Sequence, residues 1–191
     1  MSSMQGEAIN PRVCCFTQTI GFQNITQLIL VNDGSTDESS SICLEYQAKY
    51  PNNIIYLYQK NAGVSTARNE GLRHTDSKYI IFLNADDYYH QAAFSTMLQF
   101  FEYNYLKIDF LAARMKFFDQ RTDYNLHDYM FYKTRLVNLE KEFDCIPGYV
   151  TSGMFKAEAM RNLTFSKHLR YYEDAYFIGS LVLRKRTIGI V

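Results

Sequence analysis

The sequence has no tryptophan, few cysteines and no long apolar run, and its charges balance. Because it carries twenty basic and twenty acidic residues, no overall positive field draws the chain to nucleic acid. No stretch reaches the roughly 20 apolar residues that a membrane span needs. The N-terminus also lacks the basic start and apolar core of a signal peptide. We therefore expect a cytoplasmic chain with no nucleic-acid partner.

The four cysteines, Cys14, Cys15, Cys43 and Cys145, lack the Cys-x-x-Cys spacing of a zinc or redox site, so reduced thiols are expected. The glycine-rich motifs of dinucleotide-binding folds and P-loops are absent as well. No repeat and no linker rich in proline or glycine divides the chain. Its 191 residues, 47% of them hydrophobic, predict a single domain over residues 1–191 with an atypical start at residues 1–26.

What the sequence does contain is an alternation of apolar runs with helical segments. Strands are predicted at residues 27–32, 53–59, 78–84 and 108–118, and helices at residues 35–50, 61–75 and 91–105. Ser35 and Glu38 have the spacing of a capping box, which would start the first helix at Ser35. The alternation predicts an α/β fold with an open, mostly parallel sheet flanked by helices.

Acidic residues follow two of the predicted strands. Asp33 follows the first strand, and Asp86 and Asp87 follow the third. Because ligands bind beyond the carboxyl ends of parallel strands, these carboxylates are expected at one edge of the sheet. Neighbouring acids suit Mg²⁺ or Mn²⁺, which take one or two protein carboxylates and leave other positions to water and phosphate. A solvated turn with an acidic helix cap is the alternative.

Two further segments carry candidate site residues. Asn61 and Gly63 open the second helix, and Arg68 lies about one turn inside it, where helix dipole and guanidinium would both favour a phosphate. An ordinary surface helix with a glycine cap is the alternative. Glu173 and Asp174 stand among aromatic residues and could include a general base. An acid pair that offsets a helix dipole is the alternative there.

Taken in order, the segments "VNDGSTD", "NAGVSTARNEGL", "YIIFLNADDYY" and "YYEDAYF" resemble the family 2 glycosyltransferases, which have the GT-A fold. Members of this family are inverting enzymes that move a sugar from a nucleotide sugar to an acceptor, often in bacterial surface polysaccharide or lipopolysaccharide synthesis. The resemblance implies a hexosyltransferase-type enzyme with a UDP-sugar donor, Mn²⁺ or Mg²⁺, and a saccharide or lipid-linked acceptor. It also implies peripheral association with the inner face of the membrane.

The resemblance implies roles for individual residues. Asp33 would bind the nucleobase and Asp174 would be the catalytic base. The other implied nucleotide-binding residues are Gly34, Asn61, Gly63, Arg68, Asn84 and Asp86; the implied metal ligands are Asp86 and Asp87; and the implied acceptor residues are Tyr171, Glu173, Ser152 and Gly153.

The sequence departs from the family pattern at two places. The apolar strand that usually opens the family is absent, and residues 16–27 resemble the end of the first helix and its loop. This predicts an exposed sheet edge beside the nucleotide site. Asn84 stands where the first acid of Asp-x-Asp is usual, at a position that touches ribose, which an amide can also do. The alternative to a working enzyme is therefore a truncated relative that is inactive or only binds nucleotide.

Overall fold

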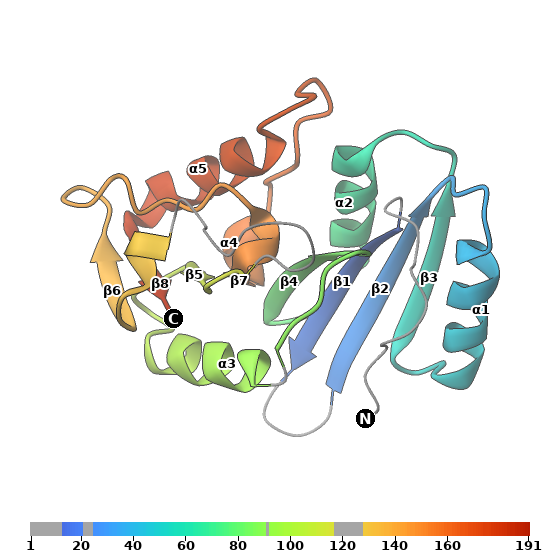
Figure 1. Ribbon diagram of the computed structural model, residues 1–191, viewed down its shortest axis with the longest axis horizontal. Coiled ribbons are helices and arrows are strands. Elements are labelled where there is room, and N and C mark those ends of the chain that lie inside the picture. Colours follow the sequence, from blue (N-terminus) through green and yellow to red (C-terminus); the bar gives the residue numbers. More distant parts are fainter. Residues whose placement is uncertain (1–12, 21–24, 91, 117–127) are drawn as a thin grey trace. The chain divides into compact units, whose positions relative to one another are not determined.

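The computed structural model describes residues 13–20, 25–90, 92–116 and 128–191, and the chain divides into two compact units. Unit 1 consists of Met1–Ser77 and Phe82–Tyr88, and unit 2 consists of Lys78–Ile81 and Tyr89–Val191. Strand β4 (Tyr79–Asn84) contributes its first half to unit 2 and its second half to unit 1. Figure 1 labels the elements of both units.

Unit 1 contains a sheet in which β2 (Ile25–Asp33) has a neighbour on each side. β3 (Ile54–Gln59) lies parallel to β2, and β1 (Val13–Ile20) lies antiparallel to it. Helix α1 (Ser39–Lys49) makes the crossover that a parallel pair requires, and α2 (Val64–Arg73) follows β3 (Figure 1). The register sets Asp33 opposite Gln59, so both side chains stand at the carboxyl edge of the sheet.

Strand β1 overturns the expectation that residues 16–27 form the end of a helix and a loop. Its residues pair with β2 along its whole length, from Val13 opposite Asn32 to Ile20 opposite Ile25. An antiparallel strand thus lies beside β2 at this flank. The expectation of an open edge at this flank of β2 is therefore wrong.

The first helix begins later than the capping box predicts. The N-cap of α1 is Glu38, and no side chain forms a cap hydrogen bond there. The backbone N–H of Ser35 donates instead to Oδ1 of Asn32 at 2.8 Å, and that of Ser39 donates to Oδ1 of Asp37 at 3.1 Å. Because Asn32 holds Ser35 in a turn, the helix starts only at Ser39.

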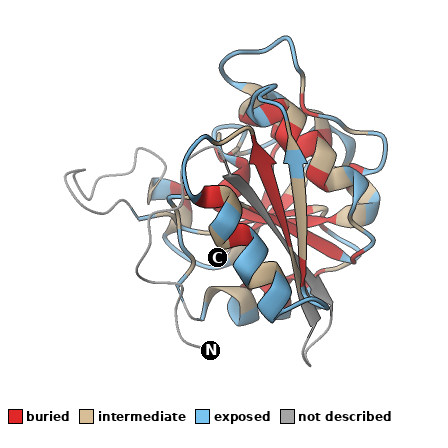
Figure 2. Cartoon of the chain, turned by 90° about the vertical axis from the view of Figure 1, so that its right-hand side faces the viewer, coloured by how far each residue is buried: buried red, intermediate tan, exposed pale blue. Residues whose placement is uncertain are grey.

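A small apolar core underlies unit 1. Leu30 of β2, Cys43 of α1 and Ile54 of β3 are buried together, and Figure 2 shows that the outer side of α1 is exposed. Burial raises the pKa of the Cys43 thiol to about 11, so this thiol stays protonated near neutral pH. Cys43 and Cys145 are both free and buried.

Unit 2 contains a mixed sheet around β7 (Gly153–Lys156). β7 lies antiparallel to β4 and to β5 (Phe110–Ala112), while β8 (Thr187–Ile190) is parallel to β5 and antiparallel to β6 (Arg135–Asn138). The sheet is therefore mixed, and not mostly parallel. The chain enters β7 from a short 3-10 turn (Val150–Ser152) rather than from the crossover helix that a parallel neighbour requires.

The predicted strand at residues 108–118 shortens to β5, Phe110–Ala112. Its neighbours end at the same level, because β7 begins at Gly153, opposite Ala112, and β8 ends at Ile190. Beyond Ala112, the backbone N–H of Ala113 donates to the carbonyl of Ser152 and that of Arg114 to the carbonyl of Val191, but these residues form no further strand. Residues 117 and 118 lie outside the described residues.

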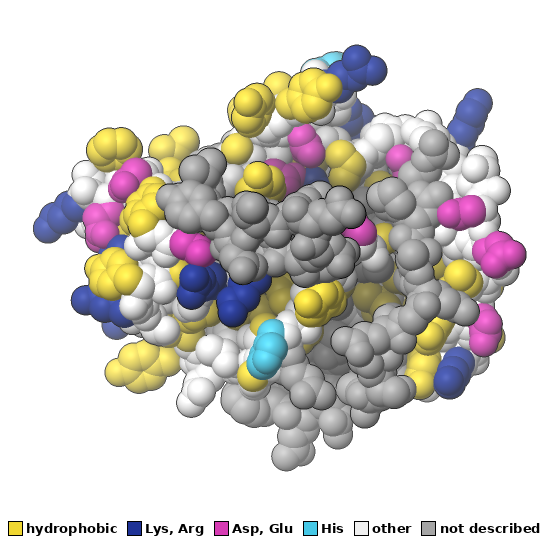
Figure 3. Space-filling model, viewed as in Figure 1, with side chains coloured by type: hydrophobic (Ala, Val, Ile, Leu, Met, Phe, Trp, Pro, Cys, Tyr) yellow, Lys and Arg dark blue, Asp and Glu magenta, His cyan; other side chains and the backbone are white. Residues whose placement is uncertain are grey.

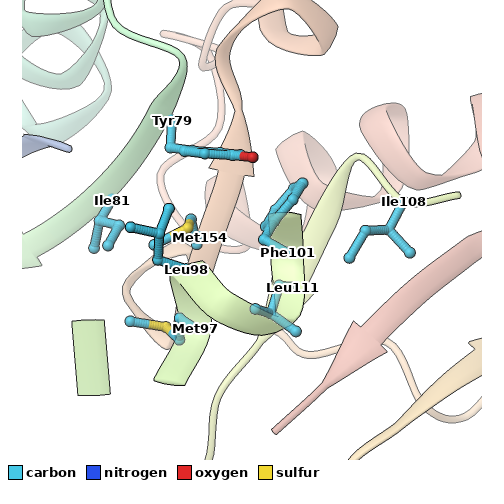
Figure 4. Close-up of a cluster of buried hydrophobic side chains, with 8 residues drawn as sticks. All are labelled: Tyr79, Ile81, Met97, Leu98, Phe101, Ile108, Leu111 and Met154. Atoms are coloured by element: carbon cyan, nitrogen blue, oxygen red, sulfur yellow. The ribbon is translucent and has the colours of Figure 1, made fainter. Parts of the chain in front are cut away.

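The core of unit 2 lies between α3 (Ala93–Tyr103) and the sheet. Figure 4 shows Leu98 and Phe101 of α3 beside Tyr79 of β4 and Met154 of β7, and the rings of Tyr79 and Phe101 lie 4.8 Å apart between centroids. The remaining helices of unit 2 are α4 (Ala157–Met160), α5 (Glu173–Lys185) and the 3-10 turn Asp128–Phe131. Within the described residues, none of the helices has the length and apolar content to cross a membrane.

A substitution of Gly153 would test how closely β7 packs against β5. A Cβ at this position would lie 2.0 Å from the carbonyl oxygen of Leu111, so Gly153→Ala must push the two strands apart. We expect urea unfolding to show a loss of about 3 kcal/mol. Gly148→Ala is the matched control, because its Cβ meets nothing within 4 Å. Equal stability of the two variants would contradict the described pairing.

Candidate active site

Asp33 ends β2 with its carboxylate turned toward the start of α2. Its Oδ1 accepts hydrogen bonds from Nε2 of Gln59 at 2.7 Å and from the backbone N–H of Ala62 at 2.8 Å. Its Oδ2 accepts from the backbone N–H of Gly63 at 2.9 Å. Only 5% of Asp33 is exposed. The carboxylate thus binds the backbone N–H of Gly63, the N-cap of α2, and that of Ala62 just before it, and it joins β2, β3 and α2 at one point.

Two glycines allow the chain to close around Asp33. Gly34 has a φ of 74°, and a Cβ there would lie 2.7 Å from the backbone nitrogen of Asn61. Gly63, the N-cap of α2, has a φ of 88°. Other residues rarely adopt either conformation. The fold therefore brings Gly34, Asn61 and Gly63 together beside Asp33, and their part in nucleotide binding stays a prediction.

A second hydrogen-bond chain runs from α2 to the end of β4. Nη2 of the buried Arg68 lies 3.5 Å from Oδ1 of Asn84, a long hydrogen bond, and Nδ2 of Asn84 donates to Oδ2 of Asp87 at 2.9 Å. Because an amide can accept on one side and donate on the other, Asn84 connects a cation with an acid. An aspartate at this position could accept from Arg68 but would repel Asp87.

The acids after β4 suit a hard cation that is shared with a phosphate group. Asp86 is exposed, and Asp87 is oriented by Asn84. In the described part of the chain, no three His, Cys, Asp or Glu residues gather as a ready-made metal cage. Two neighbouring carboxylates still fit Mg²⁺ or Mn²⁺, which bind through one or two carboxylates when substrate phosphates supply further oxygens.

Asp174 lies in unit 2, as the second residue of α5, and is 9% exposed. Its Oδ2 accepts a hydrogen bond from the backbone N–H of Val150 at 3.1 Å. This bond fixes the carboxylate against the 3-10 turn that leads into β7. The first turn of a helix also favours a negative charge. Asp174 is thus held as an oriented carboxylate, which a general base requires.

The four predicted acceptor residues have different environments in unit 2. Tyr171 is 74% exposed, and Glu173 is partly buried at the start of α5. Ser152 is buried, and its hydroxyl donates to the carbonyl oxygen of Tyr149 at 2.6 Å. Gly153 is packed against β5. Ser152 and Gly153 therefore support the turn that holds Asp174, and an acceptor role for all four stays a prediction.

Sequence reasoning missed Asn32, which orders the loop after β2. Asn32 is completely buried; its Oδ1 accepts from the N–H of Ser35, and its Nδ2 donates to Oγ of Ser40 at 2.8 Å and to the hydroxyl of Tyr56 at 3.0 Å. The signal available in the sequence was a polar residue at the end of a strand expected to be buried on both faces. A buried amide must find partners, so Asn32 indicated a fixed loop.

Asn32→Ala should therefore destabilise unit 1 by more than the loss of a single hydrogen bond would. It leaves three polar partners unsatisfied, and we expect a loss of about 2–3 kcal/mol in urea unfolding. Tyr56→Phe removes only one of these bonds and should cost about 1 kcal/mol. If both variants unfold at the same urea concentration, Asn32 does not organise the loop.

Sequence comparison relates the chain to bacterial proteins of teichoic acid biosynthesis. The chain is 42% identical over 175 residues to the minor teichoic acid biosynthesis protein GgaB of Bacillus subtilis, and 31% identical over 178 residues to GgaA of the same organism. Each alignment covers 91% of this chain, but only 19% of GgaB and 40% of GgaA. The chain thus spans less than half the length of these relatives.

Structure comparison supports the predicted fold. The crystal structure of S. aureus TarS residues 1–349 matches with a TM-score of 0.74 at 22% identity, over 85% of this chain and 48% of that one. A complex of the same TarS segment with UDP matches with a TM-score of 0.74 at 21% identity, and a complex with UDP-GlcNAc with 0.72 at 22%. The GT-A α/β fold is therefore confirmed.

The sequence profile of glycosyl transferase family 2 matches residues 16–183, which include every candidate site residue. Because this match spans most of the chain, the protein belongs to glycosyl transferase family 2.

Proposed function

We propose that the protein is an inverting glycosyltransferase that moves a sugar from a UDP-sugar to a saccharide acceptor in the synthesis of a bacterial surface polymer. The observation that carries this proposal is the arrangement around Asp33. A carboxylate offers about four acceptor positions, and donors of the described residues fill three of them. The fourth can accept the N3–H of a uracil ring. The complexes of TarS with UDP and UDP-GlcNAc support this choice of nucleotide.

The diphosphate would lie beside the residues that link α2 to the end of β4. Arg68 supplies a cation in unit 1, and Asn84 supplies an amide that can also bond a ribose hydroxyl. Asp86 and Asp87 would hold Mg²⁺ or Mn²⁺ together with the phosphate oxygens. When bound, such an ion offsets the negative charge that develops on the departing diphosphate.

Asp174 would act on the acceptor. Its carboxylate accepts the proton of an acceptor hydroxyl while that oxygen attacks the anomeric carbon of the sugar. The new carbon–oxygen bond forms on the face opposite the diphosphate, and the bond from the anomeric carbon to the diphosphate oxygen breaks, which inverts the anomeric configuration. The hydrogen bond from the N–H of Val150 to Oδ2 orients this carboxylate.

The polymer proposed as product follows from the relatives. GgaA and GgaB are named for the biosynthesis of minor teichoic acid, a polymer of the bacterial surface. Nucleotide sugars are cytoplasmic compounds, so we propose that the reaction takes place in the cytoplasm or at the inner face of the membrane, on a saccharide or lipid-linked acceptor. Which hexose is transferred would be decided by a screen of UDP-sugars.

The first prediction concerns the nucleobase. Calorimetry should show tighter binding of UDP than of ADP or GDP, because the open position on Asp33 needs the N3–H donor of uracil. Asp33→Asn should remove this preference, since its amide presents a donor where the base needs an acceptor. Gln59→Ala is the control, because it removes an internal bond of Asp33 and leaves the carboxylate in place. Equal affinity of the wild type for the three diphosphates would contradict the assignment.

The second prediction concerns the metal. UDP affinity should rise when Mn²⁺ or Mg²⁺ is added and should fall by about tenfold or more in Asp86→Ala, because the diphosphate then loses its bridging cation. Glu45→Ala, which removes an exposed acid from α1, serves as control. Unchanged UDP binding in EDTA would show that the metal has no part in nucleotide binding.

The third prediction separates an enzyme from a protein that only binds nucleotide. Asp174→Asn keeps the size of the side chain and removes its basicity. Transfer should be abolished while the affinity for the UDP-sugar stays within about threefold, because only the transition state uses the proton acceptor. A wild type that binds UDP but turns over none of the UDP-sugars tested would favour the binding-only alternative.

A further inference from the structure

We propose that the loop of residues 167–172, which immediately precedes the base helix α5, binds an anionic acceptor: a saccharide polymer linked by phosphodiesters. This inference rests on the proposed function and deepens it, because it names the chemical class of the acceptor. The loop is defined by Lys167, His168, Leu169, Arg170, Tyr171 and Tyr172.

The loop lies directly before the proposed base in the chain. Tyr172 is the N-cap of α5, and Asp174 is the second residue of that helix. Two residues of chain span at most about 7 Å, so the end of the loop lies next to the proposed base. Any acceptor whose hydroxyl reaches Asp174 must therefore pass close to this loop.

The loop also carries basic side chains. The loop carries Lys167, His168 and Arg170 and no acidic residue. None of these three side chains forms an ion pair with another residue that the structure describes. Lysine bonds a phosphate as a point charge and arginine bonds it through two parallel N–H groups. In a chain with no net charge, the two cations Lys167 and Arg170 on an exposed loop favour a polyanion.

Aromatic side chains near these cations are exposed. Tyr171 is 74% exposed, Tyr172 is 82% exposed, and Tyr176 on the first turns of α5 is 59% exposed. Figure 3 shows apolar side chains next to basic ones on the projecting loop before α5. Tyrosine rings combine a flat apolar face with a hydroxyl, which suits the C–H face and the hydroxyl groups of a sugar or polyol unit.

The loop is held at both ends by its contacts with α5. Phe165, just before it, is buried and stacks on Phe177 of α5, with ring centroids 4.0 Å apart and planes 3° apart. The exposed residues therefore project from a fixed base. Tyr172 also has a φ of 63°, a conformation that glycine adopts at less cost. A tyrosine kept at a strained position indicates that its side chain is used.

The test measures binding of a fluorescent poly(glycerol phosphate) oligomer, with neutral dextran of matched length as the control probe. The wild type should bind the phosphodiester oligomer and not dextran, and added salt should weaken binding because it screens the charges. Lys167→Ala/Arg170→Ala should weaken binding by about tenfold or more, as contacts to two phosphates are lost. Lys107→Ala/Arg161→Ala removes the same charge from exposed positions elsewhere in unit 2 and should have no effect.

Tyr172→Gly distinguishes binding from folding. Because glycine tolerates positive φ, this variant should unfold at a temperature equal to or above that of the wild type, yet bind the oligomer more weakly. A destabilised variant, or one with unchanged affinity, would overturn the role of Tyr172 as a binding side chain.

UDP affinity, measured on the same samples, separates this inference from the proposed function. Loss of oligomer binding with UDP affinity unchanged supports the loop as an acceptor site. Equal binding of the oligomer by the loop variants and the wild type overturns it, whatever UDP does. Binding to phosphatidylglycerol vesicles but not to the oligomer would identify the loop as a membrane contact and would also overturn it. A wild type that binds the oligomer but not UDP would leave this site standing and reject the proposed donor.

Discussion

The carboxylate of Asp33 is the interaction on which the candidate nucleotide site depends. It fastens the end of β2 to Gln59 at the end of β3 and to the two backbone donors that open α2. Once the start of α2 is fixed, Arg68 lies about one turn along the helix and is placed to meet Asn84. The same carboxylate therefore holds the site together and supplies the hydrogen-bond acceptor proposed for the nucleobase. Substitutions of Asp33 for this reason need a control measurement of stability.

The amide at Asn84 follows from the same arrangement. In unit 1, Asn84 accepts from Arg68 and donates to Asp87, so a neutral side chain connects the helix cation to the acids proposed for the metal. This gives a physical reason for the departure from the Asp-x-Asp pattern at its first position. The structure also accounts in part for the other departure, the absent family strand. β1 covers the flank of β2 that the absence of that strand was expected to leave open.

The sequence predicted those parts of the fold that depend on local pattern. The strands that became β2, β3 and β4 and the helices that became α2 and α3 lie within a few residues of their predicted bounds. Pairing across long stretches of chain was not predictable: nothing near Gly153 or Ile188 indicates that β7 separates β4 from β5, or that β8 joins β5. The predicted start of α1 at Ser35 was wrong, because the backbone N–H of Ser35 donates a hydrogen bond to the side chain of Asn32 three residues earlier. Strand ends and helix starts pointed to most of the candidate site residues, the family resemblance supplied their roles, and these roles remain predictions.

The most direct test of the account is a titration of the ¹⁵N-labelled protein with UDP, followed by amide chemical shifts. The central claim is that the nucleobase joins a carboxylate already bonded to the N–H groups of Ala62 and Gly63. The account predicts that these two amides and that of Gly34 shift together, with one affinity, and that ADP at the same concentration shifts them much less. Shifts confined to other residues, or identical responses to UDP and ADP, would contradict it.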